Sequence, residues 1–202
     1  MKSICVFCGS SMGKKSVYRE DAAKLGKLIG EHGDRLVFGG SNIGLMTVIA
    51  DEVMRNGGEA IGVMPHHLAS KEIAHTGLTE FVECDTMAER KQIMGDMSDA
   101  FVAMPGGFGT LDELAEVLTW LQLNLSEKPV AILNTDGFYD HLLAWLDRSR
   151  DDGFLRPEHR HNIIVADTPE ELMEKLFTYE FAEVPSKWVD EIRKDSGHDV
   201  EI

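Results

Sequence analysis

The chain has 202 residues, of which 43% are hydrophobic, and 35 acidic against 20 basic side chains give it a formal net charge of −15. This length suits one globular domain with a substantial core. The acidic balance argues against nucleic acid or an anionic membrane as the main partner. No apolar run reaches the roughly 20 residues of a membrane-spanning helix, and the N-terminus leads into a strand pattern rather than a signal peptide. We therefore expect a cytoplasmic protein.

Strand-like apolar runs alternate with amphipathic helical patterns, which is typical of a parallel sheet covered by helices on both faces. The predicted strands span residues 4–7, 35–38, 60–64, 78–84, 100–104, 130–133 and 163–165. The predicted helices span residues 16–31, 44–56, 86–97, 110–125, 139–150 and 169–179, and residues 65–76 form a predicted loop. The fold class is thus a doubly wound, Rossmann-like α/β fold. We expect one catalytic domain at 1–180 and a charged tail at 181–202 that could form an appended helix.

Cys5 and Cys8 lie three residues apart along the first predicted strand. Their side chains should therefore face opposite sides of the sheet, which makes them poor joint ligands for a metal. Three cysteines are also too few for a disulfide framework. We expect packed thiols, and we expect neither a bound metal nor another cofactor.

The helical pattern at 111–125 is apolar over more than one face. A helix of this kind must pack against other protein surface on two of its faces. The sheet is one cover, and the other is either the chain's own helices or a second subunit, for which a twofold dimer is the commonest case. We expect a homodimer.

Three glycine-containing turns follow predicted strands, at Gly9-Ser10-Ser11, at Gly39-Gly40 and at 106–109. Ligands of open parallel sheets bind at the carboxyl ends of the strands. Together the turns predict an amide-lined site to which Ser10, Gly39 and Gly40 contribute. Neither the dinucleotide glycine spacing nor a Walker lysine is present, which disfavours a dehydrogenase or an ATPase.

The stretch from Pro105 to Glu113 carries the most information. Glycines leave backbone N–H groups open, and the helix start that follows favours an anion. The predicted phosphate cradle consists of Gly106, Gly107, Phe108, Gly109 and Thr110, continued by Leu111 and Asp112. Glu113 lies one turn into the helix, within reach of the sugar of a nucleotide held by its phosphate. The alternative is structural, because Thr110 and Glu113 also fit a capping box.

Arg90 and Lys91 lie early in the helix that precedes the glycine stretch. Adjacent residues on a helix point about 100° apart, so one can face a ligand while the other points to solvent or a neighbour. Arg90 is the better candidate for the ligand, because a guanidinium binds phosphate or ribose oxygens through two parallel bonds and keeps its charge when partly buried.

These motifs together resemble the Lonely Guy (LOG) family of cytokinin riboside 5′-monophosphate phosphoribohydrolases, often labelled possible lysine decarboxylases. The resemblance covers roughly residues 4–177 and rests on the segments 87–91, 98–101, 105–113, 116–120, 128–130 and 137–139. It implies hydrolysis of the N-glycosidic bond of AMP or a cytokinin riboside 5′-monophosphate to free base and ribose 5-phosphate. It also implies that Arg90 and Glu113 are catalytic.

The same resemblance implies nucleotide contacts for Lys91, for residues 107–113, for Thr119 and, in a more divergent loop, for Glu72. The chain departs from the family at Ala88-Glu89, where a histidine or glutamine is usual, but it keeps the arginine. Cleavage of a ribosyl bond builds positive charge on the sugar, which a carboxylate at Glu113 would stabilise. A phosphate cradle predicts a preference for the monophosphate over the nucleoside.

Three other functions are compatible with parts of the pattern. A non-catalytic nucleotide or molybdenum-cofactor carrier could share the fold, although the pair of Arg90 and Glu113 argues against it. A lysine decarboxylase would need a pyridoxal phosphate lysine, and nothing around Lys91 or Lys128 indicates one. A metal site built from loop histidines is disfavoured, since neighbouring loop histidines more often contact solvent or phosphate; they are His66, His67 and His75. The sequence leaves open which base is released and whether the assembly is larger than a dimer.

Overall fold

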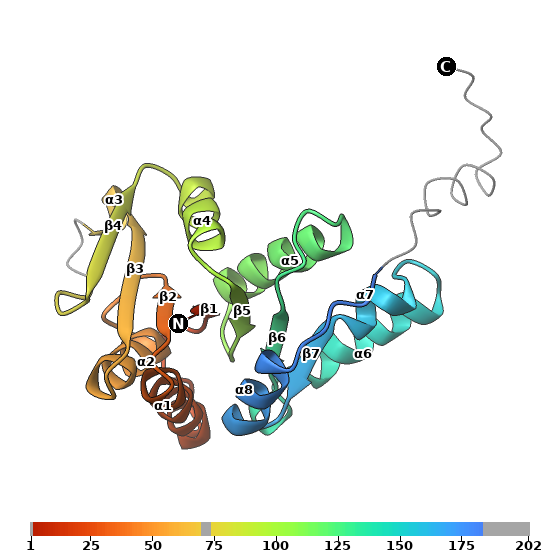
Figure 1. The fold of residues 1–202 in the computed structure, drawn as a ribbon, viewed down its shortest axis with the longest axis horizontal. Coiled ribbons are helices and arrows are strands. Elements are labelled where there is room, and N and C mark those ends of the chain that lie inside the picture. The colour runs from red at the N-terminus through yellow and green to blue at the C-terminus, as the bar shows by residue number, and fades with distance from the viewer. Residues whose placement is uncertain (1, 70–73, 184–202) are drawn as a thin grey trace, which may run out of the picture.

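The computed structural model describes residues 2–69 and 74–183. A seven-stranded sheet, parallel throughout, crosses the molecule in the order β4-β3-β2-β1-β5-β6-β7 (Figure 1). The strands are β1 (Ser3–Phe7), β2 (Arg35–Phe38), β3 (Glu59–Pro65), β4 (Glu80–Cys84), β5 (Ala100–Ala103), β6 (Val130–Leu133) and β7 (Ile163–Ala166). Each lies on a strand predicted from its apolar run, so the doubly wound α/β fold is confirmed.

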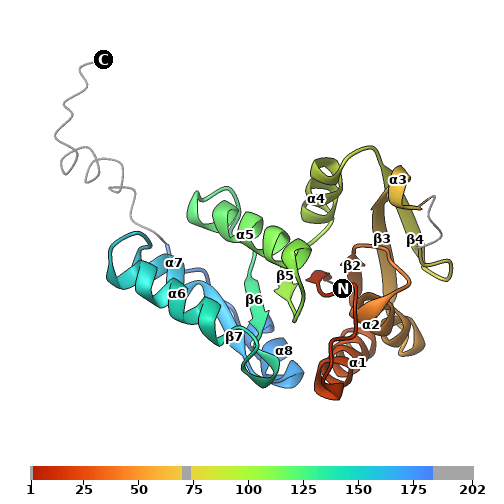
Figure 2. The same ribbon diagram turned by 180° about the vertical axis from the view of Figure 1, so that it is seen from behind.

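Helices cover both faces of this sheet. The described helices are α1 (Ser16–Glu31), α2 (Gly44–Arg55), α3 (His66–Leu68), α4 (Met87–Asp96), α5 (Phe108–Gln122), α6 (Asp140–Asp151), α7 (Pro157–His161) and α8 (Pro169–Phe177), with a 3₁₀ turn η2 (Thr135–Gly137). In both views α1, α2 and α8 lie on one side, whereas α4 and α5 lie on the other (Figures 1 and 2). Most of the tail predicted at 181–202 falls outside the described residues.

Two apolar cores fill the space between the helices and the sheet. One packs α1, α2 and α8 through residues such as Leu25, Ile49 and Leu172, and the other packs α4, α5 and α6 through Met94, Leu114 and Leu146. Cys8 belongs to the first core and Cys5 to the second. The prediction that these two buried thiols face opposite sides of the sheet is therefore confirmed.

The strand order reverses between β1 and β5. The chain runs outward from β1 through β2 and β3 to β4, and then crosses back to pair β5 with the free side of β1, where Phe7 lies opposite Ala103. The loops after β1 and β5 leave this junction on opposite faces, and such a switch point is the usual ligand site of an open parallel sheet. Both loops carry predicted glycine turns.

The start of α5 corrects one alternative from the sequence. The helix begins at Phe108 with Gly107 as its N-cap, and no side chain caps it. Thr110 and Glu113 therefore lie within the first two turns, so the capping box is wrong. A glycine can serve as N-cap without a side-chain acceptor, which leaves both side chains available for other contacts. Within residues 2–69 and 74–183, no helix is both long and apolar enough to cross a membrane.

Candidate active site

A cavity of about 220 Å³ opens at the switch point, between the loops after β1, β2 and β5. Eight of the residues predicted from the sequence line it: Ser10, Gly39, Arg90, Gly107, Phe108, Gly109, Thr110 and Glu113. Gly106 lines two adjoining hollows instead. The structure thus brings together side chains and glycines that lie more than 100 residues apart in the chain.

The glycine stretch forms one wall of this cavity. The first N–H groups of a helix have no partner within the helix, and those of Phe108, Gly109 and Thr110 occupy these positions in α5, next to the cavity. Gly106 is needed for packing, because a Cβ there would overlap the hydroxyl of buried Thr110 and lie 3.0 Å from the Gly9 nitrogen. The wall therefore offers backbone donors and a helix N-terminus to an anion.

Arg90 and Glu113 form an ion pair at the inner end of the cavity. Arg90 Nη1 donates to Glu113 Oε1 at 3.1 Å, and the two side chains are only 12% and 10% exposed. Arg90 Nε also donates to the carbonyl oxygen of Val63 at 2.9 Å. The guanidinium lies directly against Gly39, where a Cβ would overlap Nη2. These contacts fix the direction of the arginine before any ligand binds.

Burial changes the acidity of two side chains that line the cavity, Glu113 and Cys8. Burial raises the pKa of Glu113 above its ordinary value of 4.5, and the charge of Arg90 opposes this rise. Cys8 also lines the cavity, but burial and the nearby Glu113 carboxylate raise the pKa of its thiol. A thiol held in its neutral form is a poor nucleophile. The carboxylate is therefore the better candidate for chemistry.

Lys91 points away from the cavity. Its Nζ lies 3.1 Å from Asp112 Oδ2 and 3.0 Å from Glu116 Oε2, so it binds α4 to α5 on the outer side of the Arg90–Glu113 pair. Lys91 and Asp112 do not line the cavity. The expectation that one basic residue faces the site while its neighbour turns elsewhere agrees with this arrangement.

The remaining predicted residues are distributed differently. Gly40 has a φ of +72° and packs against Gly62, just outside the cavity. Leu111 borders the hollow beside the glycine stretch, and Thr119 lies in a separate groove between α5 and α6. Glu72 lies outside the described residues.

The sequence reasoning missed several contributors, among them Cys8 and the two described next. Met46, from α2, lines the cavity beside Gly39, and the Val63 carbonyl orients Arg90. The segment Gly44-Leu45-Met46 follows a predicted glycine turn, which was a usable signal for Met46. Every residue has a backbone carbonyl, so the sequence does not indicate that the one of Val63 contacts Arg90.

The histidines of the predicted loop 65–76 take separate partners, and the structure places His66 and His67 in the short helix α3. His66 pairs with Glu83, whereas His75 Nε2 lies 3.0 Å from Asp51 Oδ1. In the part of the chain that the structure describes, no three side chains of histidine, cysteine, aspartate or glutamate are grouped to hold a metal. Lys128 donates to the Gly95 carbonyl at 3.0 Å and, like Lys91, does not line the cavity.

The chain is similar to several known proteins. Residues 46–176 match a family model described as "Possible lysine decarboxylase". A protein of Oryza sativa subsp. japonica named "Probable cytokinin riboside 5′-monophosphate phosphoribohydrolase LOGL2" is 46% identical over 178 residues, 88% of this chain and 73% of that protein. Cytokinin riboside 5′-monophosphate phosphoribohydrolase LOG7 of Arabidopsis thaliana is 44% identical over 96% of this chain and 91% of its own length.

Among solved structures, the molybdenum cofactor binding protein of Rippkaea orientalis superposes with a TM-score of 0.68. It is 25% identical to this chain, and the match covers 88% of this chain and 97% of that one. The fold is therefore shared with a cofactor-binding protein, at much lower sequence identity than with the two plant proteins.

Proposed function

The chain belongs to the LOG family of cytokinin riboside 5′-monophosphate phosphoribohydrolases, and we propose that it hydrolyses the N-glycosidic bond of a nucleoside 5′-monophosphate. The products are the free base and ribose 5-phosphate, and AMP and cytokinin riboside 5′-monophosphates are the substrate class. The observation that carries the proposal is the buried Arg90–Glu113 ion pair beside the N-terminus of α5.

The α5 N-terminus and the glycine stretch would hold the 5′-phosphate. Backbone N–H groups and the helix dipole bind a phosphate without side chains, and residues 107–110 line the cavity wall. Glu113 lies between one and two turns further along the same helix, at a rise of about 1.5 Å per residue. A nucleotide held by its phosphate would therefore present its ribose to the carboxylate.

The chemistry follows from charge. As the bond between the anomeric carbon and the base nitrogen breaks, positive charge develops on the sugar, and the Glu113 carboxylate stabilises it. Water then adds to the anomeric carbon while Glu113 accepts a proton from it. The base nitrogen takes up one proton as it departs, and the loss of the proton from Glu113 to solvent restores the carboxylate, so that one water molecule supplies the hydroxyl of the sugar and, in balance, the proton of the base. Arg90 holds the carboxylate in place, and its charge can offset negative charge that develops on the base.

A non-catalytic carrier on the same fold is the competing function. The structural likeness to a cofactor-binding protein is compatible with it. A carrier has no need for a buried carboxylate paired with an arginine at the end of its anion site, however, because such a charge costs desolvation energy and adds nothing to phosphate affinity.

The test is release of free base from AMP, from isopentenyladenosine 5′-monophosphate and from adenosine, measured side by side. We expect the wild type to hydrolyse a monophosphate and to prefer it to the nucleoside. Glu113→Gln should lose about 10³-fold in kcat while still binding the nucleotide. Binding of AMP without any release of base, in the wild type, would establish the carrier instead.

We further propose that the protein acts as a homodimer through α5 and α6. A groove of about 710 Å³ runs between these helices, lined mainly by apolar side chains that include Leu118, Trp145 and Phe154. Trp145 and Phe154 are 62% and 79% exposed. Exposed apolar surface of this extent is typical of interaction sites, and a second copy offers the same surface across a twofold axis.

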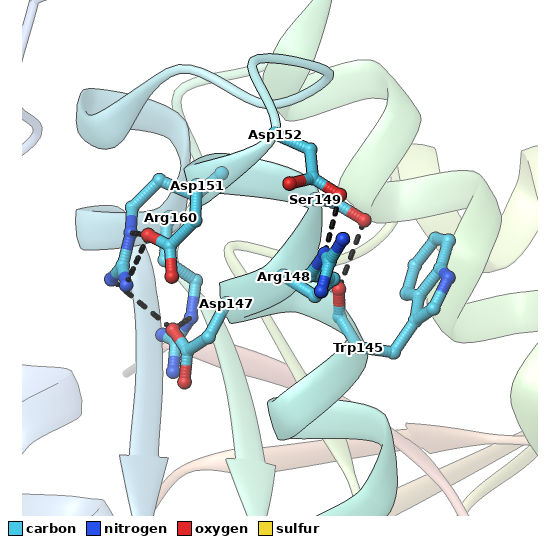
Figure 3. Close-up of polar contacts among 8 residues, drawn as sticks. Trp145, Asp147, Arg148, Ser149, Asp151, Asp152 and Arg160 are labelled. Atoms are coloured by element: carbon cyan, nitrogen blue, oxygen red, sulfur yellow. Dashed lines mark hydrogen bonds and ion pairs between the residues drawn. The ribbon is translucent and has the colours of Figure 1, made fainter.

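The other side of α6 is already occupied. Asp147 binds Arg160 of α7 at 3.0 Å, and Arg150 contacts both Asp147 and Asp151. Arg148 and Asp152 pair with one another between this group and Trp145 (Figure 3). Figure 3 shows the Trp145 ring on the side of α6 away from the Asp147–Arg160 pair. The charged face of α6 is therefore satisfied within the chain, and its apolar face is the one that favours a partner.

Thr119 fits this arrangement. It lies in the groove and not in the cavity of its own chain, so a nucleotide contact of Thr119 would have to reach the site of the other copy.

A cytoplasmic location stays a prediction from the sequence.

A further inference from the structure

The two peptide groups that lead into the glycine stretch are each held by a hydrogen bond from outside it. The carbonyl oxygen of Pro105 accepts from Gly9 N at 3.0 Å. The carbonyl oxygen of Met104, one residue earlier, accepts from the hydroxyl of Tyr139 at 2.7 Å. One donor comes from the loop after β1 and the other from the junction between β6 and α6, so the entry to the stretch is held from two neighbouring loops.

Tyr139 is itself firmly placed. It is 6% exposed, and its backbone N–H donates to Asn134 Oδ1 at 2.7 Å. Asn134 follows β6 and also binds Asp140 through its side chain at 2.9 Å. The Tyr139 ring packs edge-on against Phe138 at 4.9 Å. Because ring and backbone are both anchored, the hydroxyl is a fixed point rather than a mobile donor.

We propose that Tyr139 is a positioning residue for phosphate binding: by holding the Met104 carbonyl, its hydroxyl sets the direction in which the chain enters Gly106 and Gly107. Glycines 106 and 107 have no side chains with which to fix their own orientation, so the neighbouring peptide groups must do it. The inference rests on the proposed function, because it assigns the phosphate to the amides at the start of α5.

The position of Tyr139 supports this role. Its side chain borders the hollow formed by Gly106, Gly107 and Phe108, on the outer side of the wall that faces the cavity. Burial raises the pKa of the Tyr139 hydroxyl, so the group stays protonated and remains a donor. Tyr139 does not line the cavity itself, so it acts through the backbone and not on the substrate.

The test uses Tyr139→Phe, which removes only the hydroxyl, with Tyr179→Phe as the matched control. Among the residues that the structure describes, the buried Tyr179 hydroxyl has no hydrogen-bond partner. It lies near Glu127, which precedes the amino-terminal end of β6, whereas the cavity lies at the carboxyl ends of the strands. We measure kcat and KM for AMP in the wild-type background. In the Glu113→Gln background, where turnover is removed, we measure the Kd of AMP by calorimetry.

For Tyr139→Phe we expect KM and Kd to rise about two- to tenfold, the value of one hydrogen bond, while kcat stays within about twofold. A mutation that removes binding shared by the ground state and the transition state raises KM at constant kcat. General destabilisation instead reduces the fraction of active enzyme, so it lowers the apparent kcat at constant KM. Tyr179→Phe should change neither constant.

Unchanged affinity for AMP in Tyr139→Phe, or a fall in kcat at constant KM, would overturn the inference, as would a failure of AMP to bind at all. A wild type that binds AMP without hydrolysing it, together with weaker binding in Tyr139→Phe, would refute the proposed activity and leave the role of Tyr139 standing.

Discussion

Replacing Gly39 by alanine should disable the site while leaving the fold intact. A Cβ at position 39 would overlap Nη2 of Arg90 and lie 3.2 Å from its Cζ and 3.1 Å from Met46 Sδ. Each of these atoms belongs to the far end of a side chain, so the backbone need not shift, but the guanidinium must give up part of its contact with Glu113 or the Val63 carbonyl. The guanidinium must retreat by more than about 1 Å, and a misplacement of that size costs about 10²-fold in rate.

Stability should change little in the same variant. The backbone at Gly39 is not left-handed, so alanine is compatible with it, and removing a glycine restricts the unfolded chain by about 0.4–1 kcal/mol in favour of folding. We expect kcat/KM for AMP to fall about 10²-fold with the melting temperature within a few degrees of the wild type. Gly77→Ala is the control, since a Cβ at Gly77 would make only ordinary contact with His75.

A double-mutant cycle tests the cause of the loss. In an Arg90→Ala background there is no guanidinium to displace, so Gly39→Ala should cost almost nothing further, and the coupling should amount to about 2–3 kcal/mol. The reasoning is refuted if Gly39→Ala keeps wild-type kcat/KM, or if its loss is equally large with and without Arg90.

Three further outcomes are expected. Because burial raises the pKa of Glu113 above 4.5, kcat/KM should fall on acidification with an inflection above that pH; an inflection at or below 4.5 in a pH–rate profile would contradict the role of its carboxylate. The same shift means that the folded protein binds this proton more tightly than the unfolded chain, so the stability it contributes below pH 4.5 is lost as the pH rises through the folded pKa. The melting temperature of Glu113→Gln, relative to that of the wild type, should therefore rise as the pH increases from 4.5 through the folded pKa of Glu113. A difference in melting temperature that does not change with pH would contradict the pKa shift. Trp145→Glu should weaken self-association by about 2 kcal/mol or more, seen by light scattering after size exclusion, whereas Leu123→Glu, exposed but outside the groove, should leave it intact; equal behaviour of the two variants would rule the groove out as the interface.

The strands of the fold were predictable because most of them are short apolar runs. The short helices were not: α3 lies within the predicted loop 65–76, and α7 was not predicted. Segments such as Val130–Leu133 are fully buried, so their composition alone indicates a central strand. The start of α5 was not predictable, because Thr110 has a side-chain oxygen that could accept a capping hydrogen bond, whereas Gly107, the actual N-cap, has no side chain. The backbone after β5 decides the matter, since Gly106 and Gly107 carry the chain into the helix before Thr110 is reached. Local sequence could not show this competition between two caps.

The charged residues of the cavity were predictable from the sequence, and the groups that hold them were not. Arg90 and Glu113 are charged residues in motifs, and both line the cavity. The groups that hold them are separated from them by long stretches of chain: Gly39 lies 51 residues from Arg90, and the Val63 carbonyl lies 27 residues away. Only the fold brings such groups together, because none has a periodicity or spacing that reveals its partner.

The two helices that carry the reactive pair are joined by a second pair one residue along. Arg90 and Lys91 are consecutive on α4, and Asp112 and Glu113 are consecutive on α5. Consecutive residues on a helix point about 100° apart, so one pair, Arg90 with Glu113, faces the cavity, while Lys91 with Asp112 faces outward and is extended by Glu116.

Under the proposed mechanism, the inner pair must keep its carboxylate open to substrate and so cannot be enclosed by other groups. The outer pair does not need to contact substrate, and its ion pairs can fix the position of α4 relative to α5. Two consecutive residues on α4 thus face two consecutive residues on α5, and the proposed reaction and the alignment of the two helices are assigned to different pairs. This arrangement also accounts for a lysine that belongs to the family motif and yet does not line the cavity.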